Sequence, residues 1–212
     1  MTASRDSTRE RLVEAACRLF GREGFHGVTV RDICRAANAN VAAVNYHFGD
    51  KMALYMEVVD RAIAVMRGTT TAAQAGSAGL TPQEHLRHYI RTYLGALLQS
   101  PDANTWIHGL MNQEMSEPTK AAAKIAREAI RPRVEYLSGI VAGILQCDVH
   151  DPRVRRCAVA VQSHCLWYGR QPQTSVFRKA AFPEWPDEVT TGLTALADFV
   201  AEFSLAGVEG LR

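Results

Sequence analysis

The sequence predicts an all-α protein built from two helical regions. Apolar residues recur along most of the chain at the three- and four-residue spacing of an amphipathic helix, and no segment alternates as a strand does. Residues that start and stop helices stand between these segments. We therefore expect about nine helices: a first helix and two short ones in an N-terminal domain, residues 1–50, and the rest in a larger C-terminal domain, residues 51–212.

Helix signals are dense in the first 50 residues. Leu12, Ala16 and Phe20 recur at helical spacing, and Gly24 supplies a stop. Thr29 with Asp32 three residues later forms a capping box that opens a second helix, about 29–37. The stretch "NAN" ends it, because Asn38 tolerates the left-handed conformation and Asn40 can cap a third helix, about 41–47.

The remaining helices follow the same logic. Asp50 and Thr81 are expected caps, and Pro132 is expected to kink one long helix. The small, polar stretch 68–80 marks the seam between two regions. The expected helices span about 51–74, 82–99, 102–115, 118–145, 151–169 and 187–206, with a single turn around 176–180.

Bulk composition restricts the function classes only loosely. The 24 Lys and Arg residues exceed the 22 Asp and Glu residues by two, and this excess lies within residues 1–67, which is weak support for a nucleic-acid partner. No apolar run reaches the length of a membrane span and no signal peptide is apparent, so we expect a cytoplasmic protein with no membrane contact. The five cysteines include no C-x-x-C pair and are expected to be reduced core thiols, although a redox pair of Cys157 and Cys165 remains an alternative.

The stretch "VAAVNYHFGDK", residues 41–51, completes a helix-turn-helix layout with the preceding short helix. A major groove about 12 Å wide admits only a couple of helical turns. Val44 and Phe48 are expected to face inward, while Ala42 and Ala43 let the backbone approach DNA and Asn45 can donate and accept hydrogen bonds. Tyr46, His47 and Lys51 fall where phosphates run. An aromatic-rich turn that merely packs on the core is the other interpretation of the same residues.

The block "TVRDICRAANANVAAVNYHFGDKMALY", residues 29–55, resembles the DNA-binding segment of the TetR family of bacterial transcriptional regulators, and "EAACRLFGREGFHGVTV" resembles the family's first helix. Asn38-Ala39-Asn40 replaces the common Gly-Val-Ser, and Asn45 stands where an aromatic residue is usual. The resemblance implies binding to a double-stranded DNA operator. It implies phosphate contacts from Thr29, Tyr46, His47 and Lys51, base contacts from Arg31, Val41, Ala42 and Ala43, and a base or sugar contact from Asn45. For Arg31, a solvated charge at a helix start is the alternative.

Residues 106–145 and 161–169 resemble the ligand domain of the CecR-type subgroup, in which an acidic-Met-Ser-Glu-Pro-Thr segment leads into a long helix. This resemblance implies a homodimer formed through the last two long helices and a pocket for a small-molecule effector of unknown identity. Adaptable apolar side chains and one amide are the candidate ligand-binding residues, although each also suits an ordinary core or dimer interface. They are Trp106, Met111, Met115, Gln162, Trp167 and Tyr168.

Catalytic and metal motifs are not apparent. His85 and His88 have helical i, i+3 spacing but no third ligand, so we expect them to face solvent. The adjacent Ser163, His164 and Cys165 point to different faces of a helix. We therefore expect no enzyme activity, no catalytic residue, no cofactor and no metal.

Together, these features predict a ligand-responsive DNA-binding transcriptional regulator. It is expected to act as a repressor that binds a palindromic operator as a dimer and is released by a small molecule. Two alternatives remain open at this point: a thiol-redox-responsive regulator, and a helical small-molecule carrier or enzyme that keeps the DNA-binding bundle as a relic.

Overall fold

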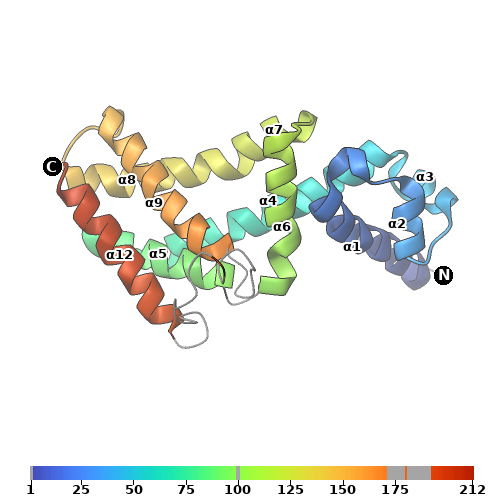
Figure 1. The fold of residues 1–212 in the computed structure, drawn as a ribbon, viewed down its shortest axis with the longest axis horizontal. Helices are drawn as coiled ribbons and strands as arrows, with labels where there is room; N and C mark the ends of the chain where they lie inside the picture. The colour runs from blue at the N-terminus through green and yellow to red at the C-terminus, as the bar shows by residue number, and fades with distance from the viewer. Residues whose placement is uncertain (1, 99–100, 171–179, 181–191) are drawn as a thin grey trace. The chain divides into compact units, whose positions relative to one another are not determined.

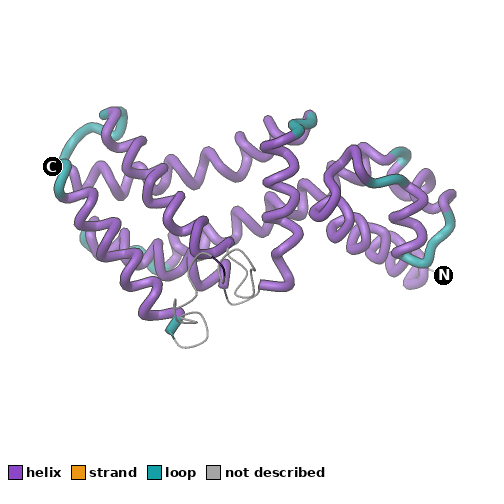
Figure 2. Tube along the Cα trace, in the orientation of Figure 1, coloured by secondary structure: helices purple, strands orange, loops and turns teal. Residues whose placement is uncertain are grey.

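The computed structural model of the chain describes residues 2–98, 101–170, 180 and 192–212, which form helices and, within these ranges, no strand (Figures 1 and 2). The predicted all-α fold class is confirmed. No helix in these ranges is long and apolar enough to cross a membrane. The helices are α1 (Thr2–Gly27), α2 (Val30–Ala36), α3 (Val41–Phe48), α4 (Lys51–Ala75), α5 (Pro82–Leu98), α6 (Pro101–Ser116), α7 (Lys120–Ile125), η1 (Ala126–Ile130), α8 (Arg131–Leu145), α9 (Pro152–Arg170) and α12 (Leu193–Glu209).

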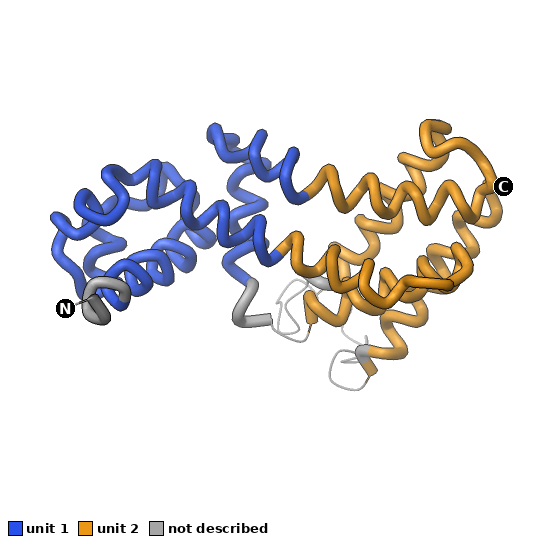
Figure 3. The backbone as a smooth tube through the Cα atoms, turned by 180° about the vertical axis from the view of Figure 1, so that it is seen from behind, with its two compact units in different colours: residues 1–65, 102–129 blue, residues 66–101, 130–212 orange. Residues whose placement is uncertain are grey.

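The chain forms two compact units (Figure 3). Unit 1 comprises residues 1–65 and 102–129, and unit 2 comprises residues 66–101 and 130–212. Helix α4 contributes to both units, because the chain passes from one to the other between residues 65 and 66. These units describe packing, and the domain boundary at residue 50 stays a prediction.

Local signals in the sequence account for most helix ends. Gly24 interrupts α1 with a φ of 72°, a conformation that suits glycine. The Asp50 carboxylate accepts a hydrogen bond from the Ala53 N–H (2.7 Å) at the start of α4. Thr81 and Glu84 form a reciprocal capping box at the start of α5, with the Thr81 N–H donating to Glu84 Oε2 at 2.8 Å.

The segment expected as one helix over 118–145, kinked at Pro132, has a different structure. It consists of α7, the π-helical turn η1 and then α8, which begins at Arg131. Proline lacks a backbone N–H and its ring crowds the preceding turn, so the irregular hydrogen bonding lies just before Pro132. The last helix begins at Leu193 rather than near 187, the intervening positions and the expected turn at 176–179 being outside the described residues.

Unit 1 packs α1 against α2 and α3 around buried apolar side chains. Phe20 and Tyr55 meet edge to face with ring centroids 4.9 Å apart. Helix α6 crosses α1 at a glycine on each helix: a Cβ on Gly109 would lie 2.0 Å from the Gly21 carbonyl oxygen. This backbone-to-backbone approach explains why residues 102–129 pack with the first helices.

Unit 2 packs α5 against α8, α9 and α12. Its core includes Leu86, Ile90, Leu137 and Val161, all buried. Ion pairs reinforce the outer edge of the α5–α12 contact, including Arg87 Nε to Glu202 Oε1 at 2.6 Å. The apolar stripes expected along these helices therefore form one core.

Candidate DNA-binding surface and effector region

The turn between α2 and α3 is held by side chains that the sequence singles out. Asn38 has a φ of 48°, the left-handed conformation expected for it. Asn40 caps α3 by accepting the Ala42 N–H at Oδ1 (2.9 Å). The Cys34 thiol lies 3.6 Å from the Asn40 carbonyl oxygen and donates to it, which ties α2 to the start of α3.

Helix α3 has one buried face and one exposed face. Val44 is fully buried, as expected, and Phe48 is half-buried beneath the Arg9 guanidinium, 5.2 Å from its ring centroid. On the other side, Ala42 and Asn45 are exposed, together with Val41 (42% exposed) and Tyr46 (66% exposed). Ala43 and His47 are partly exposed. The structure thus brings the predicted α3 contact residues onto the solvent side of one short helix, within reach of a partner.

Thr29 and Arg31 lie at the start of α2. The Thr29 hydroxyl accepts the Asp32 N–H (3.2 Å), and Asp32 Oδ2 accepts the Thr29 N–H (3.1 Å), which is the expected capping box. Hydrogen bonds from the Thr29 side chain and backbone also lower the pKa of the Asp32 carboxyl. Arg31 is exposed, so its side chain can extend from the first turn of α2.

Lys51 begins α4 directly after α3. Its ammonium lies 4.2 Å from the centroid of the Phe25 ring, a cation–π arrangement, and burial lowers the pKa of the Lys51 amine. The Asp50 carboxylate already accepts the Ala53 N–H of this turn, so the lysine charge and the helix dipole are what favour an anion at this end of α4.

The six candidate ligand-binding residues do not fall in one unit. Trp106, Met111 and Met115 lie on α6 in unit 1. The backbone of Trp106 lies against Gly21, and Met115 is 73% exposed. The other three lie on α9 in unit 2, where Gln162 accepts a hydrogen bond from the Tyr89 hydroxyl (2.6 Å) and Trp167 is 53% exposed. Their role in effector binding stays a prediction.

The expectation that His85 and His88 face solvent is wrong. Both are half-buried: His85 Nε2 lies 2.5 Å from the Tyr136 hydroxyl, and His88 Nε2 is buried with no hydrogen-bond partner among the described residues. The solvent-facing expectation rests on α5 alone, whereas residues of other segments, such as Tyr136 of α8 at His85, cover this side of the helix. No group of three or more His, Cys, Asp or Glu side chains suited to a metal ion occurs in the described ranges.

The cysteines have the surroundings of core residues. Cys17, Cys34, Cys157 and Cys165 are buried, and burial raises the pKa of Cys17 to about 11 and that of Cys165 to about 12. Such thiols stay protonated near neutral pH and react slowly with oxidants. The redox alternative is therefore not favoured.

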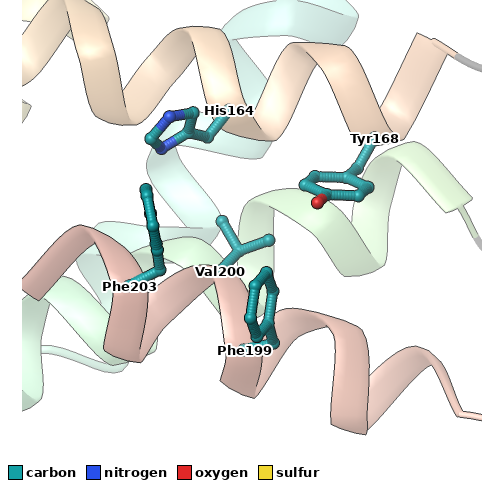
Figure 4. Close-up of a pocket in the computed structure, with 5 residues that line it drawn as sticks. All are labelled: His164, Tyr168, Phe199, Val200 and Phe203. Carbon is teal, nitrogen blue, oxygen red and sulfur yellow. The ribbon is translucent and has the colours of Figure 1, made fainter.

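Helices α9 and α12 share an exposed apolar face. A groove of about 200 Å³ between them is lined by His164 and Tyr168 of α9 and by Phe199, Val200 and Phe203 of α12 (Figure 4). Phe199 and Phe203 are 57% and 58% exposed, and their rings stack with centroids 6.1 Å apart. The sequence pattern placed Phe203 on the apolar face of the last helix, whereas the groove itself depends on the pairing of two helices.

Known proteins share both parts of this architecture. Residues 12–58 match the family described as bacterial regulatory proteins, tetR family, and residues 82–208 match the C-terminal domain of the HTH-type transcriptional dual regulator CecR. The chain is 26% identical to the HTH-type transcriptional dual regulator CecR of Shigella flexneri, over 73% of this chain and 72% of that protein. It is 23% identical to the HTH-type transcriptional repressor NicS of Pseudomonas putida, over 80% of this chain and 79% of that one.

Solved structures show the same fold. A TetR-like transcriptional regulator from Rhodococcus sp. RHA1 aligns with a TM-score of 0.66 at 18% identity, covering 96% of each chain. PfmR, a TetR family transcriptional regulator from Thermus thermophilus, aligns with a TM-score of 0.62 at 21% identity, over 91% of this chain and 97% of that one. The helix-turn-helix with an exposed α3, followed by a C-terminal region that matches over more than half the chain, thus identifies a DNA-binding transcriptional regulator of the TetR family with a CecR-type C-terminal domain.

Proposed function

We propose that this regulator is a repressor that binds a palindromic operator as a homodimer and leaves it when a small molecule binds unit 2. Each subunit inserts α3 into a major groove, the two grooves being about 34 Å or somewhat more apart. Val41, Ala42 and Ala43 meet base edges, joined by Arg31 from α2. Asn45 contacts a base or sugar, whereas Thr29, Tyr46, His47 and Lys51 hold phosphates. The protein acts in the cytoplasm by binding rather than by catalysis.

One observation carries this proposal: α3 is fixed on its inner side and exposed on its outer side. A fully buried Val44 and the caps at Asn40 and Asn38 leave the helix little freedom. A rigid helix with small side chains such as Ala42 and Ala43 can approach the floor of a groove closely and loses little side-chain entropy on binding. A turn that existed only for packing would have no need to expose Tyr46 at 66%.

Dimerisation through α9 and α12 is supported by Phe199 and Phe203, which are 57% and 58% exposed. Large exposed apolar patches mark interaction sites. A second copy of the same face would cover both phenylalanines.

Release by an effector requires only a modest energetic preference. To lower operator occupancy tenfold, the effector must favour the non-binding state by about 1.4 kcal/mol. Helix α4 is the natural link, because it begins next to α3 and continues into unit 2.

The proposal is tested by selecting bound duplexes from a random pool with wild-type protein and with Ala43→Arg. Wild type is expected to enrich a palindrome. Ala43→Arg places a long cation against base edges, so its affinity for that palindrome should fall at least about tenfold while its Tm is unchanged. Ala64→Arg, at an exposed position of α4, is the matched control and should bind as wild type does. Enrichment of no palindrome, or equal binding by Ala43→Arg, would contradict the proposal.

A further inference from the structure

A buried arginine lies in the core of unit 2, and no carboxylate of the described residues lies beside it. Arg133 of α8 is only 6% exposed. Its guanidinium donates to three neutral oxygens: Thr70 Oγ1 at 3.3 Å, the Tyr93 hydroxyl at 3.0 Å and the Met66 carbonyl at 2.6 Å. Among the described residues, no carboxylate oxygen lies within 4.0 Å of it. Within the described part of the chain, two of its five N–H groups have no acceptor and its charge has no ionic partner.

A second unsatisfied donor belongs to the same cluster. The Tyr89 hydroxyl donates to Gln162 Oε1 (2.6 Å), and Gln162 Nε2 is buried with no partner in the described part of the chain. The rings of Tyr89 and Tyr93 stack 5.8 Å apart with an interplanar angle of 8°. Tyr89 thus contacts the Gln162 amide, and Tyr93 contacts the Arg133 guanidinium. The remaining N–H groups of Gln162 and Arg133 therefore lie beside the same pair of stacked rings.

The other polar groups of the cluster are neutral. Burial raises the pKa of Tyr89 well above its ordinary value, so its phenol is protonated. Burial also lowers the pKa of His85, which favours the neutral form of this imidazole. Arg133 thus contributes one positive charge, which a single negative charge would balance.

We propose that Arg133 and Gln162 bind the carboxylate group of the effector, which is a small monocarboxylic acid with an aromatic or aliphatic body. The planar guanidinium fork matches a carboxylate in two parallel hydrogen bonds, and the amide N–H is a third donor. The neighbouring side chains belong to the apolar core of unit 2, so the body of such a molecule would contact apolar side chains. A carboxylate carries one charge at neutral pH, whereas a phosphate monoester carries nearly two and would leave charge unbalanced.

The same arginine connects the bound acid to α4. Arg133 Nη2 donates to the carbonyl of Met66, the first residue of α4 within unit 2. A carboxylate bound to the two remaining N–H groups draws the guanidinium toward itself and so weakens this attachment of α4. The Met66 carbonyl keeps a donor when the bond to Arg133 lengthens, because the Thr70 hydroxyl lies 3.4 Å away. This step rests on the proposed function, in which α4 links unit 2 to α3.

The first experiment measures the Tm of the full chain without ligand, for wild type, Arg133→Met and Arg131→Met. A buried ion kept for a ligand costs stability, so Arg133→Met should melt no lower than wild type and up to about 2–4 °C higher. Arg131 is the matched control, because its side chain is 72% exposed and pairs with Glu135 at the surface. A fall in Tm that is larger for Arg133→Met than for Arg131→Met would assign Arg133 a purely structural role and overturn the proposal.

The second experiment measures the Tm with benzoate, phenylacetate or octanoate, each against its neutral amide, and with phenyl phosphate. At least one carboxylate should raise the Tm of wild type more than its amide does. The shift should vanish in Arg133→Met and Gln162→Leu and persist in Arg131→Met. The proposal is overturned if no carboxylate exceeds its amide, if Arg133→Met keeps the shift, or if phenyl phosphate stabilises more than any carboxylate.

The two proposals fail separately. A carboxylate-dependent Tm shift with no enriched palindrome would remove the repressor mechanism and leave the carboxylate site standing. An enriched palindrome with no carboxylate-dependent shift would leave the repressor and remove this inference.

Discussion

Lys51 is one of the residues proposed to hold a phosphate. Its ammonium is held over the Phe25 ring at 4.2 Å, at the N-terminal end of α4. A side chain positioned in this way loses less conformational freedom on binding than a free surface lysine. The position follows α3 directly, so the lysine and the exposed side of α3 can meet the same duplex.

Replacing Lys51 with alanine should weaken binding to all duplexes by a similar factor, because a phosphate contact carries no sequence information. The slope of log affinity against log salt should become shallower by about one unit for each bound subunit. Binding is measured by titration over a range of salt concentrations. Lys120→Ala, at an exposed position of α7, should leave the slope unchanged. An unaltered slope in Lys51→Ala would exclude the phosphate contact.

Glu114 makes the other decisive single-residue contact, inside unit 1. It is 5% exposed and accepts hydrogen bonds from the Tyr55 hydroxyl (2.5 Å), the Thr119 N–H (3.1 Å) and the Thr119 hydroxyl (2.7 Å). The carboxylate thus connects α4 to the segment between α6 and α7. Burial, followed by the hydrogen bond to Glu114, raises the pKa of Tyr55, so its phenol remains a donor.

Glu114→Ala should lower the free energy of unfolding by about 1–3 kcal/mol, because it leaves the Tyr55 hydroxyl and the Thr119 N–H buried without an acceptor. Urea unfolding of the full chain, followed by circular dichroism, measures the change. Glu117→Ala is the comparison, since Glu117 is exposed in the same segment, and its stability should equal that of wild type. Equal stability of the two variants would show that the network contributes nothing.

At the scale of whole helices, α1 and α6 cross with their backbones in close approach. A Cβ on Gly21 would lie 2.6 Å from the Trp106 carbonyl oxygen, and one on Gly109 would lie 2.0 Å from the Gly21 carbonyl oxygen. Backbone atoms form both sides of this contact, so neither side can yield by changing a rotamer. The two glycines therefore set the distance between the first helix and α6.

Gly109→Ala should destabilise the protein by about 1–3 kcal/mol, since the added methyl group forces the two backbones apart. Gly139→Ala is the matched control, because a Cβ there meets nothing within 4 Å and α8 gains a better helix former. Thermal unfolding of both variants measures the difference. A Gly109→Ala protein as stable as Gly139→Ala would mean that the helices separate at no cost.

Which elements were predictable depends on how local their causes are. The caps at Thr29, Asn40 and Thr81 follow from side chains that bond to the backbone two or three residues away, so sequence alone indicates them. The glycine crossing and the Arg133 cluster depend on segments far apart along the chain, and no spacing rule reaches that far. The burial of His85 could not be predicted for the same reason, because the residue that covers it, Tyr136, belongs to α8.

The candidate site divides in the same way. The exposed face of α3 could be predicted from the sequence. The helix is short and lies between two caps, and Val44 and Phe48 form its inward apolar side, so the opposite side must face solvent. The candidate ligand residues on α6 and α9 were chosen for side-chain chemistry alone. That criterion selected Gln162 and did not select Arg133, whose proposed role depends on its burial, because a basic residue after a proline resembles an ordinary surface charge until its neighbours are known.

For the molecule as a whole, the question is how two copies of α3 come to act together. A single short helix with few base contacts binds weakly, whereas two linked helices gain from the high effective concentration of the second one. The apolar face of α9 and α12 is the surface proposed to provide this link. Without a partner, Phe199 and Phe203 leave apolar surface in contact with water, which is unfavourable in free energy.

Phe203→Asp should therefore convert the dimer into a monomer. A carboxylate placed at each of two symmetric positions in an apolar interface is buried without a partner, which costs about 3–5 kcal/mol per charge and weakens dimerisation at least about 100-fold. Sedimentation measures the association state, and titration measures affinity for the selected palindrome and for a single half-site. The monomer should bind both with the same weak affinity. Val149→Asp, exposed in the loop before α9, should remain a dimer and keep the preference for the palindrome. A dimeric Phe203→Asp protein would place the interface elsewhere. A monomer that still prefers the palindrome would separate operator recognition from dimerisation.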